Sequence, residues 1–438
     1  MKVAIYWYGA EGQSSYRYYS QKGDDVTIVT PKVSPSFPLP EGAKSIVGEI
    51  AADQLNGFDI VVRSAGTRPD SLKTDGKIWS STNEFFAQCP VPIIGVTGTK
   101  GKGTTSSLIA SILRAAGKTV HLVGNIGTPP LDVLPNISPD DIVVFELSSF
   151  QLWDLEKSPH VAVVLMIEPD HLDVHSSMEE YVDAKGAIRR YQTLDDICFY
   201  HPTNTYAHHI AMTGDWPEDD EERVQWQEQA FRYATKQAVY IEDGKFMVHG
   251  VPICSTDAVQ LPGDFNLENA CAAISAARVF TVDSSAIEQG LRDFNGLPHR
   301  LNYVDEIDGV AYYDDSIATT PGSARAAMHA FDTPKVLIFG GSDKGADYEQ
   351  LVKEAGATNT QVVAIGQTGE KIAQYCSDHA VPCQRVTGGM IEVVQAAQSM
   401  AKPGGVVILS PASASFDQYN SYSDRGDQFV AAVKGLKG

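Results

Sequence analysis

The sequence predicts an α/β protein with three domains, each a mostly parallel sheet flanked by helices. The chain has 438 residues, which is too long for one ordinary hydrophobic core. Short apolar runs of strand length alternate with stretches that can form helices, which is the pattern of βα units. A glycine-rich loop, GTKGKGTT at 98–105, lies between an apolar run and a helical stretch and predicts a phosphate-binding domain in the middle of the chain.

Residues 1–90 are expected to form a Rossmann-like domain. The runs KVAIYW, DVTIVT and DIVVRSAG have the character of strands, and polar stretches compatible with helices separate them. FFAQCPVP, residues 85–92, carries two prolines and indicates a linker. We therefore expect a second domain to begin at residue 91.

Residues 91–296 are expected to form the P-loop domain. The runs PIIGVTG, TVHLVGN, DIVVFELSS and VAVVLMI are continuously apolar, which fits strands buried on both faces. After Lys102 the apolar residues recur at helical spacing, and Gly117 provides a stop. Strand, glycine-rich loop and helix thus follow one another in the order that a P-loop requires. The acidic stretch 215–228 shows no strand pattern and is interpreted as a solvated loop and helix.

Residues 297–438 are expected to form a third, Rossmann-like domain. Its predicted strands GVAYYDD, KVLIFGG, QVVAIGQ and GGVVILSPAS alternate with helical stretches, again a doubly wound pattern.

Composition excludes several classes of partner. The net charge of −21 repels nucleic acid and anionic membranes, so neither is expected to bind. The six cysteines lie far apart without a CxxC pair, which predicts core thiols instead of disulfides or a zinc site. The N-terminus lacks the pattern of a signal peptide, and no apolar stretch has the length of a membrane span. We expect a cytoplasmic protein, and a monomer because nothing in the sequence demands an oligomer.

The glycine-rich loop has the chemistry to bind a nucleotide. Its glycines allow a tight turn that aims backbone N–H groups at phosphate oxygens, and Lys102 is placed to reach the terminal phosphates. Gly103 stands where a hydroxyl residue commonly helps to hold Mg²⁺, so Thr104 is the candidate ligand and Thr105 the alternative. The competing interpretation is a glycine-rich turn that binds nothing.

Two further side chains follow predicted strands. Glu146, in FELSSFQL, is costly in so apolar a run unless it is paired or bound to a metal, although it could also cap a helix. His171, in EPDHLDVH, is flanked by Asp170 and Asp173 and suits a divalent ion or a phosphate. Taken alone, His171 would more often be an ordinary hydrogen-bonded histidine.

The order of these motifs resembles the Mur ligase family. GTKGKGTT, ELSSFQL, DHLD and YVDAKGAI are followed by GDFNLENACAA, GLPHR, DDSIATTPGS, GGSDKGADY and SPASASFDQYNSYSDRG. The resemblance implies an ATP-dependent amide ligase of peptidoglycan precursor synthesis. Such an enzyme would add D-glutamate to UDP-N-acetylmuramoyl-L-alanine through an acyl phosphate, with ATP, two Mg²⁺ ions and a carbamylated lysine at Lys185. Without the neighbouring motifs, Lys185 would be interpreted as a solvated helical lysine.

The resemblance also implies the roles of individual residues. Catalysis would involve Lys102, Lys185, His171 and Glu146, and the metal ligands would be Thr104, Glu146, His171 and Lys185. ATP would contact Gly98, Thr99, Lys100, Gly101, Lys102, Gly103, Thr104, Asn266, Asn269, Arg300 and Asp315, with His299 nearby. The UDP-linked substrate would contact Gly9, Gly12, Ser64, Asn125 and His171, and D-glutamate would contact Thr319, Lys344, Ser415 and Tyr422.

The sequence departs from the family pattern at several positions. Trp7 replaces the first glycine of the N-terminal fingerprint, Glu11 is expected near a diphosphate, and Met166 stands where an asparagine is common. Gly103 makes the loop similar to that of folylpolyglutamate synthase, and Ile317 replaces a lysine found in many D-glutamate ligases. The alternatives are therefore a folylpolyglutamate synthase-like ligase, a non-catalytic nucleotide-binding relative, or a plain P-loop phosphotransferase. The C-terminal motifs and the separate N-terminal domain oppose the first, and the joint presence of the four catalytic candidates opposes the second. A phosphotransferase would explain neither Lys185 nor the third domain.

Overall fold

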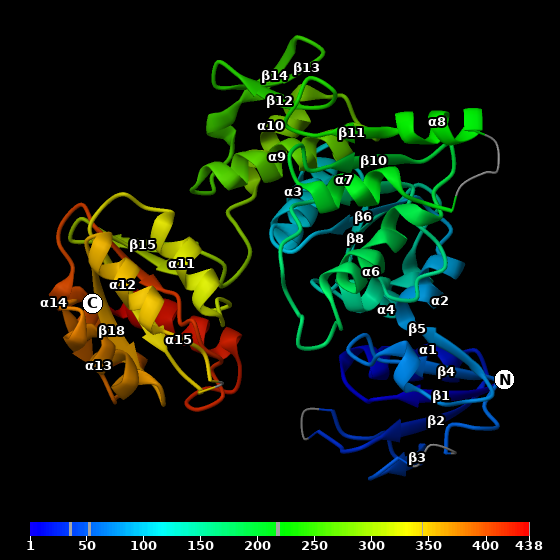
Figure 1. Cartoon of the computed structure of the whole chain (residues 1–438), viewed down its shortest axis with the longest axis horizontal. Helices are drawn as coiled ribbons and strands as arrows, with labels where there is room; N and C mark the ends of the chain where they lie inside the picture. Colours follow the sequence, from blue (N-terminus) through cyan, green and yellow to red (C-terminus); the bar gives the residue numbers. More distant parts are fainter. Residues whose placement is uncertain (35–36, 51–53, 216–219, 344, 438) are drawn as a thin grey trace. The chain divides into compact units, whose positions relative to one another are not determined.

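The computed structural model describes residues 1–34, 37–50, 54–215, 220–343 and 345–437 (Figure 1). The chain forms two compact units, Met1–Val259 with Phe265–Phe294, and Gln260–Asp264 with Asn295–Gly438. The predicted α/β architecture of mostly parallel sheets flanked by helices is confirmed. The boundary expected at residues 90 and 91 lies inside the first unit and stays a prediction. No described helix is both long and apolar enough to cross a membrane.

The N-terminal sheet of the first unit is entirely parallel, in the order β3-β2-β1-β4-β5. Val3, Ile5 and Val62 pack against Tyr19 of α1 on one face, and Ala4, Val29 and Val61 form the other cluster with Leu55 and Leu72. The elements are β1 Lys2–Tyr6, α1 Ala10–Gln21, β2 Asp25–Thr30, β3 Lys44–Val47, β4 Ile60–Arg63, η1 Pro69–Ser71, β5 Lys77–Ser80 and α2 Ser81–Gln88.

The second sheet of this unit is also parallel, in the order β11-β10-β9-β6-β8-β7. Its central strands are buried on both faces, with α3, α9 and α10 contributing to one core and α6 and α7 to the other. The elements are β6 Ile93–Thr97, α3 Lys102–Ala115, β7 Val120–Gly124, α4 Pro130–Val133, η2 Leu134–Asn136, β8 Ile142–Glu146, α5 Ser149–Leu152, β9 Val161–Val164, α6 Met178–Arg190, β10 Ile197–Tyr200, α7 Thr205–Met212, α8 Asp220–Glu228, β11 Ala230–Arg232, α9 Asp264–Ala277 and α10 Ser284–Asp293.

Two features of this region go beyond the predicted strands. A small antiparallel sheet, β12-β13-β14, is inserted before α9; it comprises β12 Tyr240–Glu242, β13 Lys245–Val248 and β14 Val251–Ser255, followed by η3 Thr256–Ala258. The acidic stretch forms α8, apart from residues 216–219, which lie outside the described residues. Trp226 of α8 is buried and packs on the guanidinium of Arg189, and Nε2 of Gln227 donates to the carbonyl of Met212 at 3.4 Å, so side-chain contacts connect this helix to the domain.

The sheet of the second unit has the order β15-β16-β20-β17-β18-β19, in which only the edge strand β15 is antiparallel to its neighbour. Helices α11, α12 and α13 contribute to one core cluster, and α14 and α15 to the other. The elements are β15 Asn302–Ile307, β16 Val310–Asp314, α11 Pro321–His329, β17 Lys335–Gly340, α12 Glu349–Ala357, β18 Thr360–Ile365, α13 Gly369–Asp378, β19 Cys383–Arg385, α14 Met390–Met400, β20 Val406–Leu409 and α15 Tyr422–Gly435.

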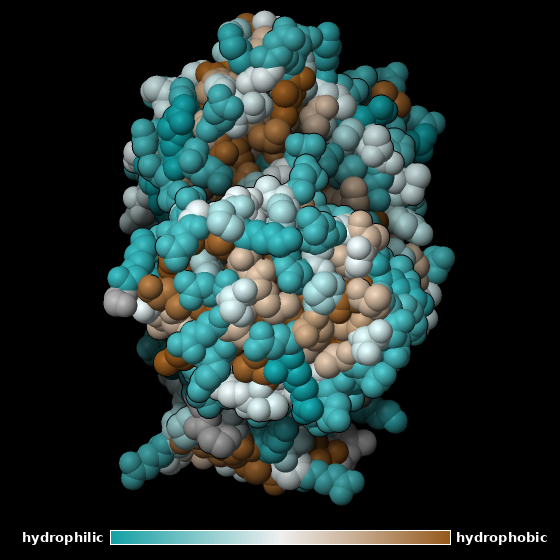
Figure 2. Space-filling model, turned by 90° about the vertical axis from the view of Figure 1, so that its left-hand side faces the viewer, coloured by the Kyte–Doolittle hydropathy of each residue, from teal (hydrophilic) through white to brown (hydrophobic). Residues whose placement is uncertain are grey.

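The surface reflects the charged composition of the chain. Figure 2 shows one face, on which hydrophilic side chains are widely spread and hydrophobic side chains lie in smaller groups between them. Such a mixed surface is ordinary for a globular protein, because polar groups cannot cover all of it.

Candidate active site

Three of the four predicted catalytic residues of the first unit lie at or after the carboxyl ends of three neighbouring parallel strands, and the fourth, Lys185, lies on α6. The glycine-rich loop follows β6, Glu146 ends β8, and His171 lies in the segment after β9. Val96 of β6 pairs with Glu146, and Thr97 pairs with Val164 of β9. Ligands of open α/β sheets bind at this edge, so the strand order itself makes these segments a candidate site.

The loop requires glycine at two positions. Gly98 and Gly101 have φ angles of +150° and +84°, which side chains rarely adopt. A Cβ atom on Gly98 would lie 2.7 Å from Cβ of Leu165, and one on Gly101 would lie 2.5 Å from Oδ1 of Asn269. Helix α3 then begins at Lys102, so its first N–H groups, which have no partner within the helix, face the loop.

Lys102 and the residues around it are fixed by contacts within the site. Nζ of Lys102 donates to the carbonyl oxygens of Gly98 at 3.1 Å and Thr99 at 3.0 Å. Nζ of Lys100 lies 3.2 Å from the carboxylate of Glu168, and Thr104 is buried in the first turn of α3. The lysine predicted to contact phosphate therefore lies directly over the loop.

The two predicted adenine contacts, Asn266 and Asn269, lie against the same loop. Nδ2 of Asn269 donates to Oδ1 of Asn266 at 3.3 Å, and Oγ1 of Thr105 donates to Oδ1 of Asn269 at 3.5 Å. The start of α9 is thus joined to the start of α3, and the structure brings these two candidates close to the glycine-rich loop.

Glu146 is buried with half of its carboxylate unsatisfied. The residue is 3% exposed, and its Oε1 accepts a hydrogen bond from Nδ2 of Asn125 at 3.4 Å. Its Oε2 is buried and has no hydrogen-bond partner among the described residues. An orphaned buried carboxylate oxygen is costly, and a divalent cation would supply the missing partner. The residue therefore fits the role of a metal ligand.

Lys185 lies inside the domain, so the interpretation of a solvated lysine is wrong. The residue is 1% exposed on α6, and its Nζ donates to the carbonyl of Gly98 at 3.0 Å and to Oγ1 of Thr97 at 3.3 Å. Burial, helped by the positive charge of Lys102, lowers the pKa of Lys185 well below its usual range. A lowered pKa increases the neutral fraction of the amine at any given pH.

His171 occupies the more exposed side of the segment after β9. Its φ of +53° is left-handed, its side chain is 49% exposed, and its Nε2 lies 3.7 Å from Asp170. Among the described residues, no group of three His, Cys, Asp or Glu side chains could hold a metal ion. Mg²⁺ commonly binds one or two protein carboxylates together with substrate phosphates, so it does not need such a cluster.

Sequence reasoning missed the aromatic stack beneath His171. The imidazole of His175, a residue 1% exposed, stacks on Phe150 at a ring distance of 5.4 Å and lies 4.4 Å from Trp153. Phe150 in turn contacts the ring of His171 at 4.9 Å. Phe150, His171 and His175 lie in quoted motifs and Trp153 directly follows one, but only the fold reveals that their rings meet.

Among the candidates for the UDP-linked substrate, Gly9 and Ser64 lie on the loops after β1 and β4, and Gly12 lies in the first turn of α1. Gly9 precedes α1, and a Cβ atom on Gly12 would lie 2.4 Å from the carbonyl of Trp7. Oγ of Ser64 lies 3.1 Å from Oγ1 of Thr67. Glu11, expected to repel a diphosphate, accepts a hydrogen bond from Nε2 of Gln151 at 3.2 Å.

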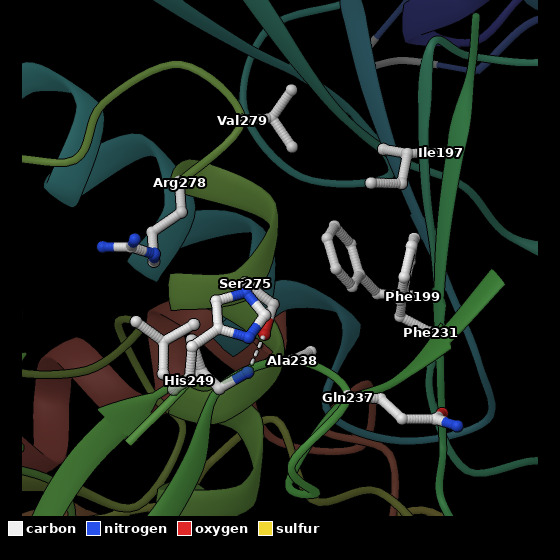
Figure 3. Close-up of a pocket in the computed structure, with 11 residues that line it drawn as sticks. Ile197, Phe199, Phe231, Gln237, Ala238, His249, Ser275, Arg278 and Val279 are labelled. Carbon is white, nitrogen blue, oxygen red and sulfur yellow. Dashed lines mark hydrogen bonds between the residues drawn. The ribbon is translucent and has the colours of Figure 1, made fainter. Parts of the chain in front are cut away.

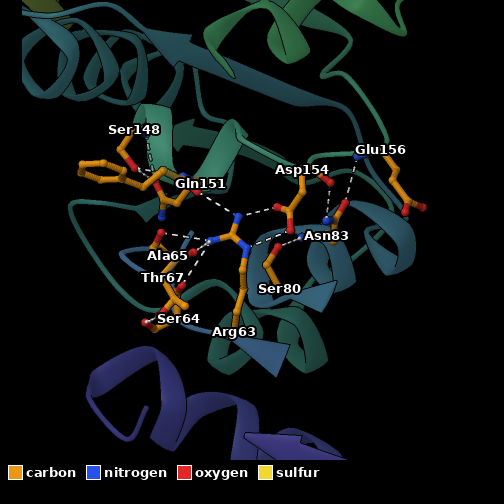
Figure 4. A network of polar contacts seen from close by, with 11 residues as sticks. Arg63, Ser64, Ala65, Thr67, Ser80, Asn83, Ser148, Gln151, Asp154 and Glu156 are labelled. Carbon is orange, nitrogen blue, oxygen red and sulfur yellow. Dashed lines mark hydrogen bonds and ion pairs between the residues drawn. The ribbon is translucent and has the colours of Figure 1, made fainter. Parts of the chain in front are cut away.

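Arg63, which the sequence did not single out, fixes the loop that carries Ser64 (Figure 4). It is 2% exposed, and its guanidinium donates to the carbonyls of Ser64, Ala65 and Thr67 at 3.0–3.1 Å. It also donates to the carbonyl of Phe150 at 3.0 Å and forms an ion pair with Asp154. The loop after β4 is therefore attached to the segment that follows Glu146.

The remaining candidates belong to the second unit. Asp315 is 6% exposed and accepts hydrogen bonds from Oγ of Ser410 at 2.7 Å and from the backbone of Leu301 at 3.1 Å. Nδ1 of His299 lies 2.7 Å from Asp314, and Arg300 is exposed. Of the D-glutamate candidates, Ser415 is buried and Thr319 and Tyr422 are exposed, whereas Lys344 lies outside the described residues.

Asp315 predicts a measurable pH dependence. Burial raises its pKa from the ordinary 3.8 to about 7, so between these values the folded protein keeps a proton that the unfolded chain has lost. The contribution of Asp315 to the free energy of unfolding should therefore fall by ~1.4 kcal/mol for each pH unit through this range. Above the range it should level off. Denaturant unfolding of the wild type and Asp315→Asn at several pH values measures the difference. Parallel curves for the two proteins would contradict the prediction.

A hollow elsewhere in the first unit contains none of the predicted residues. It has a volume of about 360 Å³ and is lined by β10, β11 and the C-terminal end of α9, including Phe199, Phe231 and Arg278 (Figure 3). Asn266 and Asn269 lie at the opposite end of α9. The hollow is therefore separate from the glycine-rich loop.

The chain matches known proteins along its whole length. Residues 96–277 match the Mur ligase middle domain, and residues 299–413 match the Mur ligase, glutamate ligase domain. A UDP-N-acetylmuramoylalanine–D-glutamate ligase of Streptococcus thermophilus is 33% identical over 100% of this chain and 98% of its own. One of Acetivibrio thermocellus is 36% identical over 100% of this chain and 97% of its own.

Solved structures share the fold at lower identity. UDP-N-acetylmuramate-alanine ligase of Thermotoga maritima has a TM-score of 0.63 at 17% identity and covers 100% of both chains. MurF ligase of Thermotoga maritima in complex with ADP has a TM-score of 0.57 at 17% identity, covering 99% of this chain and 95% of its own. Two family domains and full-length relatives above 30% identity together show that this chain belongs to the Mur ligase family.

Proposed function

We propose that this protein is an ATP-dependent ligase that joins D-glutamate to UDP-N-acetylmuramoyl-L-alanine in peptidoglycan precursor synthesis. Full-length relatives carry this activity in their names. The structural observation that carries the proposal is the buried amine of Lys185, which donates to the glycine-rich loop. A plain phosphotransferase gives no reason for such a lysine, whereas a ligase that uses its carbamate does.

The substrates are assigned to three segments of the chain. Residues 1–90 would bind the UDP-linked substrate, residues 91–296 would bind ATP, and residues 297–438 would bind the amino acid. The separate sheets of these segments support this division. The residues proposed for each substrate are those predicted from the sequence, including Asn125, whose backbone N–H donates to the carbonyl of Glu146 at 3.1 Å. A cytoplasmic monomer remains a prediction.

The reaction begins with attack of the substrate carboxylate on the γ-phosphate of ATP. This forms an acyl phosphate and releases ADP, and it brings like charges together, so the site must compensate negative charge. Lys102 and the N-terminus of α3 would bind the phosphates. Mg²⁺ held by Thr104, Glu146, His171 and carbamylated Lys185 would supply further positive charge when bound.

The second half of the reaction forms the amide bond. The amine of D-glutamate attacks the acyl carbon, and a tetrahedral intermediate collapses to the amide and inorganic phosphate. The amine must be neutral to attack, so it loses a proton before or during this step. Because water would hydrolyse the acyl phosphate, exclusion of water from the closed site is part of the function.

We also propose that Lys185 is carbamylated. A neutral amine adds CO₂ and loses a proton, and the resulting carbamate is an anion. The lowered pKa of Lys185 supports the proposal, because only the neutral amine reacts with CO₂. The modification replaces a repulsive ammonium with an oxygen ligand of the kind that Mg²⁺ prefers.

The decisive experiment is ADP release with ATP, Mg²⁺ and UDP-N-acetylmuramoyl-L-alanine in the presence of different amino acids. Turnover is expected with D-glutamate and absent with L-glutamate, L-lysine or no amino acid. Turnover with another amino acid would move the specificity and would show that Ile317 matters for it. Turnover with a folate in place of the UDP-linked substrate would contradict the proposal and favour the folylpolyglutamate synthase interpretation suggested by Gly103.

A further inference from the structure

Arg425, on α15, is a buried cation without an acidic partner. The residue is 1% exposed, and its Nε donates to Oγ of Ser316 at 3.0 Å. Its Nη2 donates to the carbonyls of Ser316 at 2.9 Å and Ser413 at 3.1 Å, and its Nη1 also donates to Ser413 at 3.1 Å. All these acceptors are neutral oxygens, and no described carboxylate forms an ion pair with this guanidinium.

These contacts connect the segments that carry the D-glutamate candidates. Ser316 lies three residues before Thr319, and Ser413 lies two residues before Ser415. Oγ of Ser316 donates in turn to the carbonyl of Tyr422 at 2.7 Å. One guanidinium therefore sets the relative positions of the turn after β16, the loop after β20 and the start of α15.

Burial of the charged Arg425 side chain is energetically unfavourable, so a functional role for the charge would explain why it is buried. Burying a guanidinium with only neutral acceptors carries a large desolvation cost. That burial lowers the pKa of Arg425 to about 10, while Tyr419, Asp417 and Asp314 act in the opposite direction. The side chain therefore stays charged at physiological pH, close to segments that are proposed to receive a substrate with two carboxylates.

The residues around Ser316 explain why a positive charge matters in this part of the second unit. The turn that contains Ser316, DDSIATTPGS at 314–323, has no lysine or arginine. A substrate with two carboxylates needs positive charge or good donors for each of them. The net charge of −21 makes a local positive potential all the more necessary.

We propose that Arg425 is a positioning residue of the amino-acid site, which fixes the segments carrying Thr319, Ser415 and Tyr422 and supplies the positive charge that the turn 314–323 lacks. The inference rests on the proposed function. Because Arg425 is buried, it acts through Ser316 and Ser413 and does not touch the substrate. It makes the site selective for an acidic amino acid.

The test compares Arg425→Lys, Arg425→Gln and Ser316→Ala with the wild type. The KM for D-glutamate is expected to rise by roughly 100-fold in Arg425→Gln, since misplacing site groups by an ångström can cost that much. Arg425→Lys, which retains the charge, and Ser316→Ala, which retains the guanidinium, should show smaller increases. The KM values for ATP and the UDP-linked substrate should stay unchanged in all three variants.

Two controls separate positioning from a structural role. Arg189 is also buried without an ion pair, and its guanidinium donates to Oε1 of Gln192 and to the carbonyl of Trp226. Arg189→Lys should lower the melting temperature without a specific effect on D-glutamate. If the Arg425 variants lower stability and change all three KM values equally, or change none of them, the inference is wrong.

A half-reaction distinguishes this inference from the proposed function. Without D-glutamate, the acyl phosphate can be trapped with hydroxylamine, and this trapping should be equal in the wild type and Arg425→Gln. Failure of the wild type to form any trapped product would contradict the proposed function itself. Loss of trapping in Arg425→Gln alone would show that Arg425 serves the nucleotide site and would overturn the assignment to the amino-acid site.

Discussion

Lys185→Ala is expected to abolish most of the ligase activity, by roughly 10²–10³-fold, the range seen when one group that stabilises transition-state charge is removed. The alanine can carry no carbamate, so an anionic oxygen ligand for Mg²⁺ is lost. Short carboxylates such as acetate, or high chloride, should restore part of the activity, because a small anion can occupy the space of the missing side chain. The measurement is ADP release at saturating substrates, with and without added acetate.

Lys118→Ala provides the control, since Lys118 is exposed after α3 and should contribute nothing to turnover. A readout independent of activity is the carbamate signal of the intact protein in ¹³C NMR after addition of labelled CO₂. This signal should be absent from Lys185→Ala. Unchanged turnover in Lys185→Ala, or a carbamate signal that persists there, would remove Lys185 from the mechanism.

Much of the fold follows from the continuity of the apolar runs. IIGVT, IVVFE and VAVV are buried throughout, and their apolar side chains pack into a core on one face or the other. The strand predicted from VAVVLMI ends earlier than its apolar pattern, at Val164. Beyond it, the carbonyl of Met166 accepts a hydrogen bond from the backbone of Thr99, which draws this segment toward the glycine-rich loop. The apolar pattern indicates that a residue is buried. It does not indicate whether the backbone of that residue bonds to a neighbouring strand or to a loop.

The small sheet formed by β12, β13 and β14 was not predicted. Its strands are three to five residues long, and the longest apolar run in them, Phe246–Val248, has only three residues. It is stabilised by long-range packing, since Phe246 and Cys254 are buried in the same core as α3 and α9. In so short a segment, the intrinsic preference of the residues for a β-strand contributes less than these tertiary contacts.

The sequence predicted those site residues that lie at the ends of strands. It did not predict those whose side chains bind backbone carbonyl oxygens. The glycine-rich loop and Glu146 have a fixed place relative to apolar runs, so the sequence indicates them. Arg63 and Arg425 bind the carbonyl oxygens of Phe150 and Ser316, which lie far away along the chain, and any residue type can offer a carbonyl. No spacing in the sequence marks such an arginine as buried, so its role becomes visible only in the fold.

Glu146→Gln is expected to uncouple activity from stability. Activity should fall by roughly 10²–10³-fold, because a neutral amide is a poor substitute for an anionic ligand that helps to compensate phosphate charge. The free energy of unfolding without ligands should stay constant or rise by about 1 kcal/mol, since a buried carboxylate with an unpartnered oxygen is replaced by an uncharged group of similar shape. Active sites commonly contain groups of this kind, which are needed for function but lower the stability of the folded protein.

The measurement pairs turnover with thermal unfolding, in the absence of ligands and in the presence of Mg²⁺ and ATP. The wild type should gain stability from Mg²⁺ and ATP together, beyond what ATP gives alone, because a ligand that binds only the folded state raises its stability. In Glu146→Gln this additional gain should disappear. Glu156→Gln is the matched control: Glu156 is an exposed acid paired with Lys77, and its replacement should leave the gain intact. A Glu146→Gln protein that loses stability without ligands but keeps its response to Mg²⁺ would show that the carboxylate is structural, and the metal site would then have to be built from other residues.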